Sequence, residues 1–179
     1  MGMPKIFLKI RGSTFLERIC GNFKKAGAFA TVVVLGHKAG EYSAGIPPGC
    51  LIAVNRDYKK GQITSLWAGL KTAKKLGAEG VMLTLADHPL VRPGTYGILV
   101  KKLEENPCNI IIPSYNFKSG HPILFGGRWF ESFMSAPLDK GAKEVMRGNR
   151  EQVLYVNLND PGVLKDLDTL EDYKNALKR

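Results

Sequence analysis

Long apolar runs and paired cysteines are what this 179-residue sequence lacks. No stretch approaches the roughly 18 apolar residues of a membrane-spanning helix, and the opening MGMPKIFLKI has no long apolar core or small-residue cleavage pattern of a secretion signal. The three cysteines, Cys20, Cys50 and Cys108, form no CxxC spacing and are odd in number, which argues against a disulfide framework or a zinc knuckle. We therefore expect a soluble, cytoplasmic protein whose thiols are reduced and mostly structural.

Acidic residues are also scarce. The sequence has 16 aspartates and glutamates against 26 lysines and arginines, a formal net charge of +10. Such a charge suits nucleic acid, a membrane surface or small polyanions. Lysine pairs at 24–25, 74–75 and 101–102 fall near the ends of predicted helices, where cations complement the helix dipole. Because no helix-turn-helix, RNA-recognition or zinc-finger pattern is present, we expect a phosphate-rich small substrate, with no nucleic acid and no membrane as partner.

The sequence alternates predicted helices with predicted strands. Hydrophobic residues make up 44% of it, and no repeat or linker interrupts residues 1–179, which indicates a single α/β domain. Short β-branched or apolar runs predict strands at 30–36, 51–55, 80–86, 109–113, 122–125 and 153–158. We expect the first three to be buried strands of a parallel sheet.

Capping signals delimit the predicted helices. Thr14 and Glu17 form a capping box for a helix over 14–26, and Thr169 with Asp172 does the same for the last helix. Apolar spacing predicts a helix that ends before Gly77, with Thr64 or Ser65 as its N-cap. Further helices are expected after Pro93, around 127–135 and around 140–147.

In the stretch GVMLTLADHPLV, residues 80–91, an acid, Asp87, directly follows a predicted buried strand. Ligands of open α/β sheets gather outside the carboxyl ends of the strands, where Asp87 lies. A carboxylate there suits Mg²⁺, which takes hard oxygen ligands and usually only one or two from the protein. The alternative is that Asp87 only caps the turn ahead of Pro89.

A second acidic cluster lies in VLKDLDTLEDY. Asp166 and Asp168 are two residues apart, so both carboxylates point to one side of an extended segment. Two such charges repel each other unless a cation or a donor is near. We therefore predict a Mg²⁺ site formed by Asp87, Asp166 and Asp168, with helix capping by Asp168 or Thr169 as the alternative.

Four motifs in order resemble a known family. The segments LTLADHPLV, SGHPILF, NRDYKKGQITSLWAGL and DLDTLEDY are similar to the nucleotidyltransferases that act on molybdenum cofactor, most of all their cytidylyltransferase branch. That branch has Asp-Gln-Pro where this sequence has Asp87, His88 and Pro89, Gly-His-Pro at 120–122 and Asp-Ile-Asp-Thr at 166–169. The resemblance implies a three-layer α/β/α Rossmann-like fold with a mostly parallel sheet.

The resemblance also implies a reaction. A nucleotide monophosphate, CMP or alternatively GMP, would pass from CTP or GTP to a phosphorylated acceptor such as molybdopterin cofactor, with release of pyrophosphate. A phosphate monoester is already ionised at neutral pH, so positioning and charge neutralisation suffice and no strong general base is needed. Asp87, Asp168 and Lys5 are the expected catalytic residues, and Mg²⁺ is the expected cofactor.

Two further groups of residues have implied roles. The resemblance assigns the nucleotide to Gly2, Lys5, Asn55, Gly61, Thr64 and Ser65. The N-terminus of the helix near Ser65 offers unpaired amides for a base or a phosphate, although a plain N-cap is the alternative. His121 contacts the acceptor or orders its loop, or is an ordinary exposed imidazole, and His88, in place of the family's glutamine, is a second acceptor-binding candidate.

The sequence departs from the family at its first residues. Members begin with a strand and a glycine-rich Leu-Ala-Ala-Gly-x-Ser-x-Arg-Met-Gly segment that cradles the triphosphate, and here only Met1, Gly2 and Lys5 match its tail. The absent strand belongs to the middle of the family's sheet, so we expect unpaired edges on its two neighbours unless another segment fills the gap. A start further upstream, a genuine truncation and a residual non-catalytic domain remain alternatives. For residues 1–179 as they stand we expect weak or absent transferase activity.

Two classes of function therefore remain open. The first is the Mg²⁺-dependent nucleotidyltransferase. The second is a non-catalytic protein that binds molybdenum cofactor or nucleotide and passes it to a molybdoenzyme partner. The sequence also leaves open a homo-oligomer, because a sheet that lacks a strand invites pairing with another copy.

Overall fold

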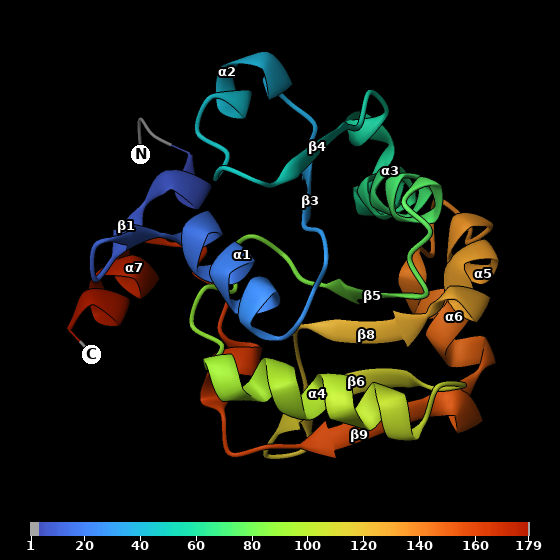
Figure 1. Cartoon of the computed structure of the whole chain (residues 1–179). Coiled ribbons are helices and arrows are strands. Elements are labelled where there is room, and N and C mark those ends of the chain that lie inside the picture. Colours follow the sequence, from blue (N-terminus) through green and yellow to red (C-terminus); the bar gives the residue numbers. More distant parts are fainter. Residues whose placement is uncertain (1–3, 179) are drawn as a thin grey trace.

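The computed structural model describes residues 4–178, and Figure 1 shows their arrangement. The helices are α1 (Phe15–Lys25), α2 (Ala39–Ser43), α3 (Gln62–Lys75), α4 (Pro93–Glu105), α5 (Phe130–Met134), α6 (Ala142–Gly148) and α7 (Leu170–Leu177). The strands are β1 (Lys9–Ile10), β2 (Ser13–Thr14), β3 (Val32–Leu35), β4 (Leu51–Val54), β5 (Gly80–Leu83), β6 (Ile110–Tyr115), β7 (Lys118–Ser119), β8 (Ile123–Gly126) and β9 (Val153–Asn157). Every predicted helix and strand has a counterpart, which confirms the α/β class. In the described residues no helix has both the length and the apolar character needed to cross a membrane.

The strands run mostly in one direction. β5, β8 and β6 follow one another in the larger sheet, β9 pairs with β6 in parallel, and β8 is the antiparallel member between β5 and β6. β3 and β4 form a parallel pair of their own. The mostly parallel sheet expected from the sequence is therefore confirmed, with β8 as the main exception.

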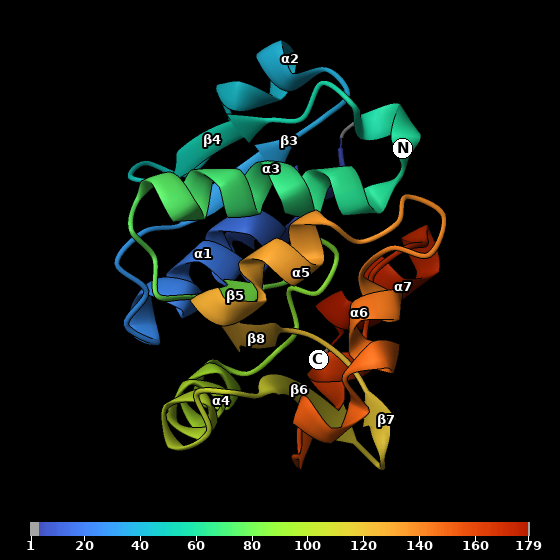
Figure 2. The ribbon, with the colours of Figure 1, turned by 90° about the vertical axis from the view of Figure 1, so that its right-hand side faces the viewer.

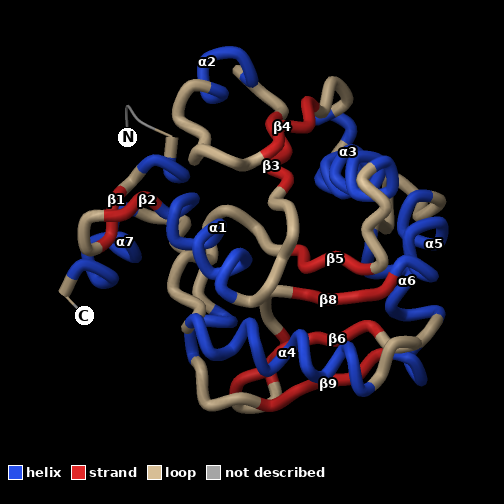
Figure 3. Tube along the Cα trace, viewed as in Figure 1, coloured by secondary structure: helices blue, strands red, loops and turns tan. Residues whose placement is uncertain are grey.

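The sheet is divided between β3 and β5. Among the described residues, β3 pairs with β4 alone and β5 pairs with β8 alone, and no ladder joins the two. Figure 3 shows β3 and β4 set apart from the stacked strands β5, β8, β6 and β9. All four residues of β5 are half-buried, which is unusual for a strand in the middle of an α/β domain. The expectation of two unpaired edges is confirmed for this part of the chain.

The expectation that the early strands are buried is wrong for β4. Leu51, Ile52 and Val54 are 42%, 41% and 55% exposed. α3 packs on the face that carries Val34, whose ladder partner is Ala53. Because side chains alternate along a strand, Ile52 and Val54 point to the opposite face, which α3 does not cover.

Helices cover both faces of the larger sheet, as Figures 1 and 2 show. Ile110 and Ile112 of β6 pack in the cluster that contains Leu70 of α3 and Phe133 of α5. Ile111, between them, packs with Leu99 of α4 on the other face. The alternation along this one strand places its side chains in two cores, so the fold has three layers, α/β/α.

The predicted caps are right at two helices and wrong at a third. Thr14 with Glu17 and Thr169 with Asp172 both form complete capping boxes. The N-cap of α3 is Gly61, not Thr64 or Ser65. Gly61 has φ +119°, a conformation that favours glycine, and the helix starts one residue later.

Candidate active site

Three loops converge at the carboxyl end of β5. The amide of Leu167 donates to the carbonyl of Asp87 at 2.9 Å, and the amide of His121 donates to the carbonyl of Val163 at 2.9 Å. These two bonds join the loop after β5, the segment before β8 and the segment before α7, which are far apart in the sequence. The predicted residues Asp87, His88, His121, Asp166 and Asp168 all lie on these loops.

Two glycines allow the loops to approach this closely. A Cβ on Gly120 would lie 2.0 Å from the carbonyl oxygen of Val163, and a Cβ on Gly162 would lie 2.3 Å from the carbonyl oxygen of Leu90. Both distances are far below a van der Waals contact. The backbones can therefore stack only because neither position has a side chain.

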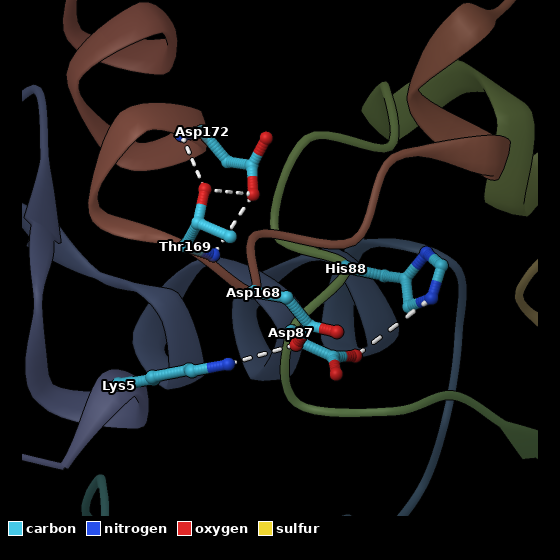
Figure 4. Close-up of polar contacts among 6 residues, drawn as sticks. All are labelled: Lys5, Asp87, His88, Asp168, Thr169 and Asp172. Atoms are coloured by element: carbon cyan, nitrogen blue, oxygen red, sulfur yellow. Dashed lines mark hydrogen bonds and ion pairs between the residues drawn. The ribbon is translucent and has the colours of Figure 1, made fainter.

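Asp87 and Asp168 form the acidic centre of the site, which Figure 4 shows with Lys5 and His88 on either side. The ammonium group of Lys5 lies 2.8 Å from Oδ1 of Asp168. Oδ1 of Asp87 is buried and has no hydrogen-bond partner within the described residues. A buried carboxylate oxygen without a partner is costly, so this atom fits a cation or a donor supplied by a ligand.

Neither Asp87 nor Asp168 has the capping role that was the alternative to ligand binding. The side chain of Asp87 caps no turn, since its one polar contact in the described chain is His88, 3.7 Å away. The N-cap of α7 is Thr169 and not Asp168. Neither carboxylate is therefore used as a cap: Oδ1 of Asp87 has no hydrogen-bond partner in the described chain, and Asp168 is paired with Lys5.

The predicted three-ligand metal set is not assembled. In residues 4–178 no three histidine, cysteine, aspartate or glutamate side chains are placed to hold a metal ion together. Asp166 lies near enough to His88 to act on the pKa of that imidazole, behind Asp87 in strength. Mg²⁺ commonly takes one or two protein carboxylates and leaves the other positions to water and phosphate, so Asp87 and Asp168 still suit it.

His88 and His121 lie beside the acids as a neutral pair. Their ring centroids are 4.9 Å apart, and Nδ1 of each is buried without a hydrogen-bond partner. Burial lowers the pKa of His88, against the opposing effect of Asp87. Burial and then the neighbouring His88 lower the pKa of His121 to about 4, against a hydrogen bond to the backbone of Leu83. That bond supports the loop-ordering role of His121 and leaves Nδ1 for a ligand.

The predicted nucleotide-binding residues form a second group around the start of α3. Asn55 is 4% exposed, and its Nδ2 donates to Oγ1 of Thr64 at 2.8 Å and to Oγ of Ser65 at 3.0 Å. Its Oδ1 accepts from the amide of Asp57 at 2.9 Å, and Oγ1 of Thr64 donates to the carbonyl of Gly61 at 2.8 Å. The network orders the turn that leads into α3. The remaining predicted residue, Gly2, lies outside the described residues.

Two residues that tie the loops together were missed by the sequence reasoning. The carboxylate of Asp160 is buried and binds donors from α4 and from its own turn. The sequence Asp160, Pro161, Gly162 is a turn signal that could have drawn attention to it. Arg18 of α1 donates from Nε to the carbonyl of Pro89 at 3.2 Å, and no local pattern marks that contact.

The cysteines are free, as expected. Burial, together with a nearby Cys50 thiol, raises the pKa of Cys20 to about 12. Cys20 is therefore protonated at neutral pH and is a poor nucleophile.

Comparisons with known proteins agree with this geometry. A family model described as the MobA-like NTP transferase domain matches residues 1–153. The purine catabolism protein PucB of Bacillus subtilis is 29% identical over 121 residues, which are 67% of this chain and 58% of PucB. The chain thus spans less than two thirds of this curated relative.

Solved structures match over nearly the whole chain. Rv0371c from Mycobacterium tuberculosis has a TM-score of 0.84 at 27% identity, covering 100% of this chain and 91% of that one. Its manganese complex has a TM-score of 0.79 at 26% identity, covering 99% of this chain and 94% of that one. Molybdopterin-guanine dinucleotide biosynthesis protein A from Archaeoglobus fulgidus, at 19% identity and a TM-score of 0.68, covering 99% and 90%, shows the shared fold.

Proposed function

This chain belongs to the MobA-like NTP transferase family, and on that premise we propose that it transfers a nucleotide monophosphate from a nucleoside triphosphate to a phosphorylated small molecule, releasing pyrophosphate. The observation that carries the proposal is the acidic centre. Asp87 and Asp168 come from loops joined by the Leu167 to Asp87 hydrogen bond, and Oδ1 of Asp87 is buried without a hydrogen-bond partner in the described chain.

A divalent cation fits this donor set. Asp87 and Asp168, with Asp166 nearby, would hold Mg²⁺, which when bound supplies positive charge to the phosphates. The manganese complex of Rv0371c supports a divalent cation of this kind for a related protein. Lys5, which pairs with Asp168, adds a second positive charge at the same place.

The chain's own residues position the reactants. A phosphate monoester is ionised at neutral pH, so the reaction requires alignment and charge neutralisation, not a strong base. The lowered pKa values of His88 and His121 agree with this, because both imidazoles are neutral at pH 7 and serve as hydrogen-bonding groups for the acceptor. The α3 turn around Asn55 and Ser65 is the proposed nucleotide site.

The donor and the acceptor form the finer part of the proposal. We favour CTP as donor over GTP, and a molybdopterin-type phosphate as acceptor, because of the four motifs at 55–70, 83–91, 119–125 and 166–173. The second candidate is a non-catalytic binding protein. The direct ion pair between Lys5 and Asp168 favours it, because the lysine then neutralises one of the acids that the cation would use.

A thermal-shift experiment tests the proposal. The melting temperature is measured with CTP, GTP or ATP, each with Mg²⁺, with Mn²⁺ and without metal. Ligand at about a hundred times its Kd adds about 2.7 kcal/mol, and for a chain of this size that should raise the melting temperature by roughly 5–10 °C. A metal-dependent shift with one nucleotide supports the proposal and identifies the base.

The matched variants are Asp87→Asn and the exposed Glu151→Gln, which make the same carboxylate-to-amide change. Asp87→Asn should abolish the metal-dependent shift, and Glu151→Gln should keep it. Pyrophosphate release with a phosphorylated pterin then separates the two candidates. Binding without turnover favours the non-catalytic protein, and equal shifts for wild type and Asp87→Asn contradict the metal site.

A further inference from the structure

We propose that Asp160 is a positioning residue that holds the loops of the acidic centre in register. This inference rests on the proposed function, which gives those loops their role. Asp160 is 3% exposed and lies between β9 and α7 in the sequence. None of the predicted roles or sequence motifs includes it.

The carboxylate of Asp160 gathers donors from two separate segments. Oδ2 accepts from the amide of Arg92 at 2.9 Å and from Oγ1 of Thr95 at 2.6 Å, both at the start of α4. Oδ1 accepts from the amide of Gly162 at 2.9 Å, in the 3-10 turn Pro161–Leu164. One buried carboxylate thus ties the N-terminus of α4 to that turn through three hydrogen bonds.

This contact is more than an ordinary helix cap. A capping side chain normally precedes its helix directly, but the N-cap residue of α4 is Arg92, whose side chain makes no capping bond. The cap comes from Asp160, 65 residues from Thr95 in sequence. Hydrogen bonds to a charged acceptor are roughly twice as strong as neutral ones, so this long-range link is a strong polar tie between the two segments.

From these two segments the link extends to the acids. Arg92 lies five residues after Asp87 on the same loop. The turn at Gly162 packs against the carbonyl of Leu90, two residues before Arg92. If α4 and the turn moved apart, the loop carrying Asp87 would lose a support on each side.

The turn supports the other two loops as well. The carbonyl of Val163 accepts from the amide of His121. The chain then continues through Lys165 and Asp166 to Leu167, whose amide donates to the carbonyl of Asp87. The position of Asp160 therefore sets the relative positions of Asp87, His121 and Asp168, and this is the register on which a shared cation or phosphate depends.

Amide hydrogen exchange measured by NMR tests the inference without any ligand. In Asp160→Asn, the amides of Leu167 and His121 should exchange at least tenfold faster than in the wild type. Amides of β9, which pair with β6, serve as the internal reference and should change much less. Glu151→Gln makes the same chemical change at an exposed position and should leave all of these rates unchanged.

A milder pair of variants keeps the test decisive if Asp160→Asn unfolds. Thr95→Val removes the hydroxyl that donates to Asp160, and Thr95→Ser retains it. Faster exchange at Leu167 and His121 in Thr95→Val, restored in Thr95→Ser, supports the positioning role. Unchanged exchange at both amides, or an equal increase in β9, overturns it, because either result means that Asp160 does not act on these loops selectively.

Mn²⁺ binding, followed by electron paramagnetic resonance, links the inference to the site. If wild type binds Mn²⁺, the Kd should rise at least tenfold in Asp160→Asn and stay constant in Glu151→Gln. An unchanged Kd in Asp160→Asn contradicts the positioning role. If the wild type binds no Mn²⁺, the proposed function fails, and hydrogen exchange still decides whether Asp160 positions the loops.

Discussion

The ammonium group of Lys5 lies 2.8 Å from the carboxylate of Asp168, although 163 residues separate them in the sequence. Both side chains are partly exposed, at 38% and 58%. Ion pairs of this kind contribute little to stability because water screens them. We therefore expect this ion pair to affect the charge of the site and to contribute little to the stability of the fold.

We predict that Lys5→Met changes stability little and ligand binding strongly. The free energy of unfolding should change by less than about 1 kcal/mol, as for other exposed pairs. The affinity for nucleoside triphosphate with Mg²⁺ should fall about tenfold or more, because the proposed contact of the Lys5 ammonium group with phosphate is lost. Denaturant unfolding and isothermal titration measure the two quantities. A large loss of stability with unchanged affinity would assign Lys5 to the fold instead.

Gly120→Ala should be strongly destabilising. The added methyl group would lie 2.0 Å from the carbonyl oxygen of Val163, so the backbone must move, at a cost of about 3 kcal/mol or more. Gly97→Ala is the matched control in α4, where a Cβ meets nothing within 4 Å. It should stabilise the protein by about 0.5–1 kcal/mol. Urea unfolding of the two variants measures both changes in the free energy of unfolding. An unchanged free energy of unfolding in Gly120→Ala would contradict the close approach of the loops.

Stability should fall as the pH drops from about 6.5 to about 4. Burial lowers the pKa of His121 to about 4 in the folded protein, so in this range the unfolded chain binds a proton that the folded chain does not. Stability then rises with pH across this window and is complete above the unfolded pKa. At about 1.4 kcal/mol per pKa unit, the effect is at most about 3.5 kcal/mol. Melting temperatures of wild type and His121→Gln from pH 4 to 8 measure it, and an equally steep slope in His121→Gln would exclude His121 as the source.

Asn55→Ala should lower the free energy of unfolding by about 1–3 kcal/mol. The substitution leaves the amide of Asp57 without its acceptor and the hydroxyls of Thr64 and Ser65 without their donor, and unpaired buried polar groups are costly. Asn175→Ala, on the exposed side of α7, should change stability by no more than about 0.5 kcal/mol. Chemical denaturation compares the two. Similar small effects in both variants would mean that the Asn55 network adds nothing to the fold.

The sequence predicted elements well where local signals and packing agree. The capping boxes at Thr14 and Thr169 placed two helix starts correctly, and the β-branched runs placed β3, β6 and β9. It failed at Gly61 because Thr64 and Ser65 have side chains typical of caps, while the network around Asn55 uses those side chains for another purpose. Capping propensity reflects the local preference of a side chain, and it does not include hydrogen bonds to residues outside the helix.

Site prediction followed the same division. Asp87 and Asp168 could be proposed as site residues because acids at the end of a strand and in an alternating pair are visible in the sequence. The assembly of the site depends on the contact of Gly120 with Val163 and on the bonds of Asp160, which join residues far apart in the chain. No local pattern encodes such distances. The short elements β1, β2, β7 and α2 were missed for a related reason, since two to five residues carry too little periodicity to read.

The division of the sheet has a consequence for cooperativity. Since no ladder joins β3 to β5 in the described chain, the two sheets share no backbone hydrogen bonds, and helix α3 packs against both through Gly69 and Leu70. We therefore expect each sheet to open as its own cooperative unit, because the two are linked by side-chain contacts and not by a ladder. On mild denaturation we expect β3 and β4 to separate first, while β6 and β9 persist around the larger core.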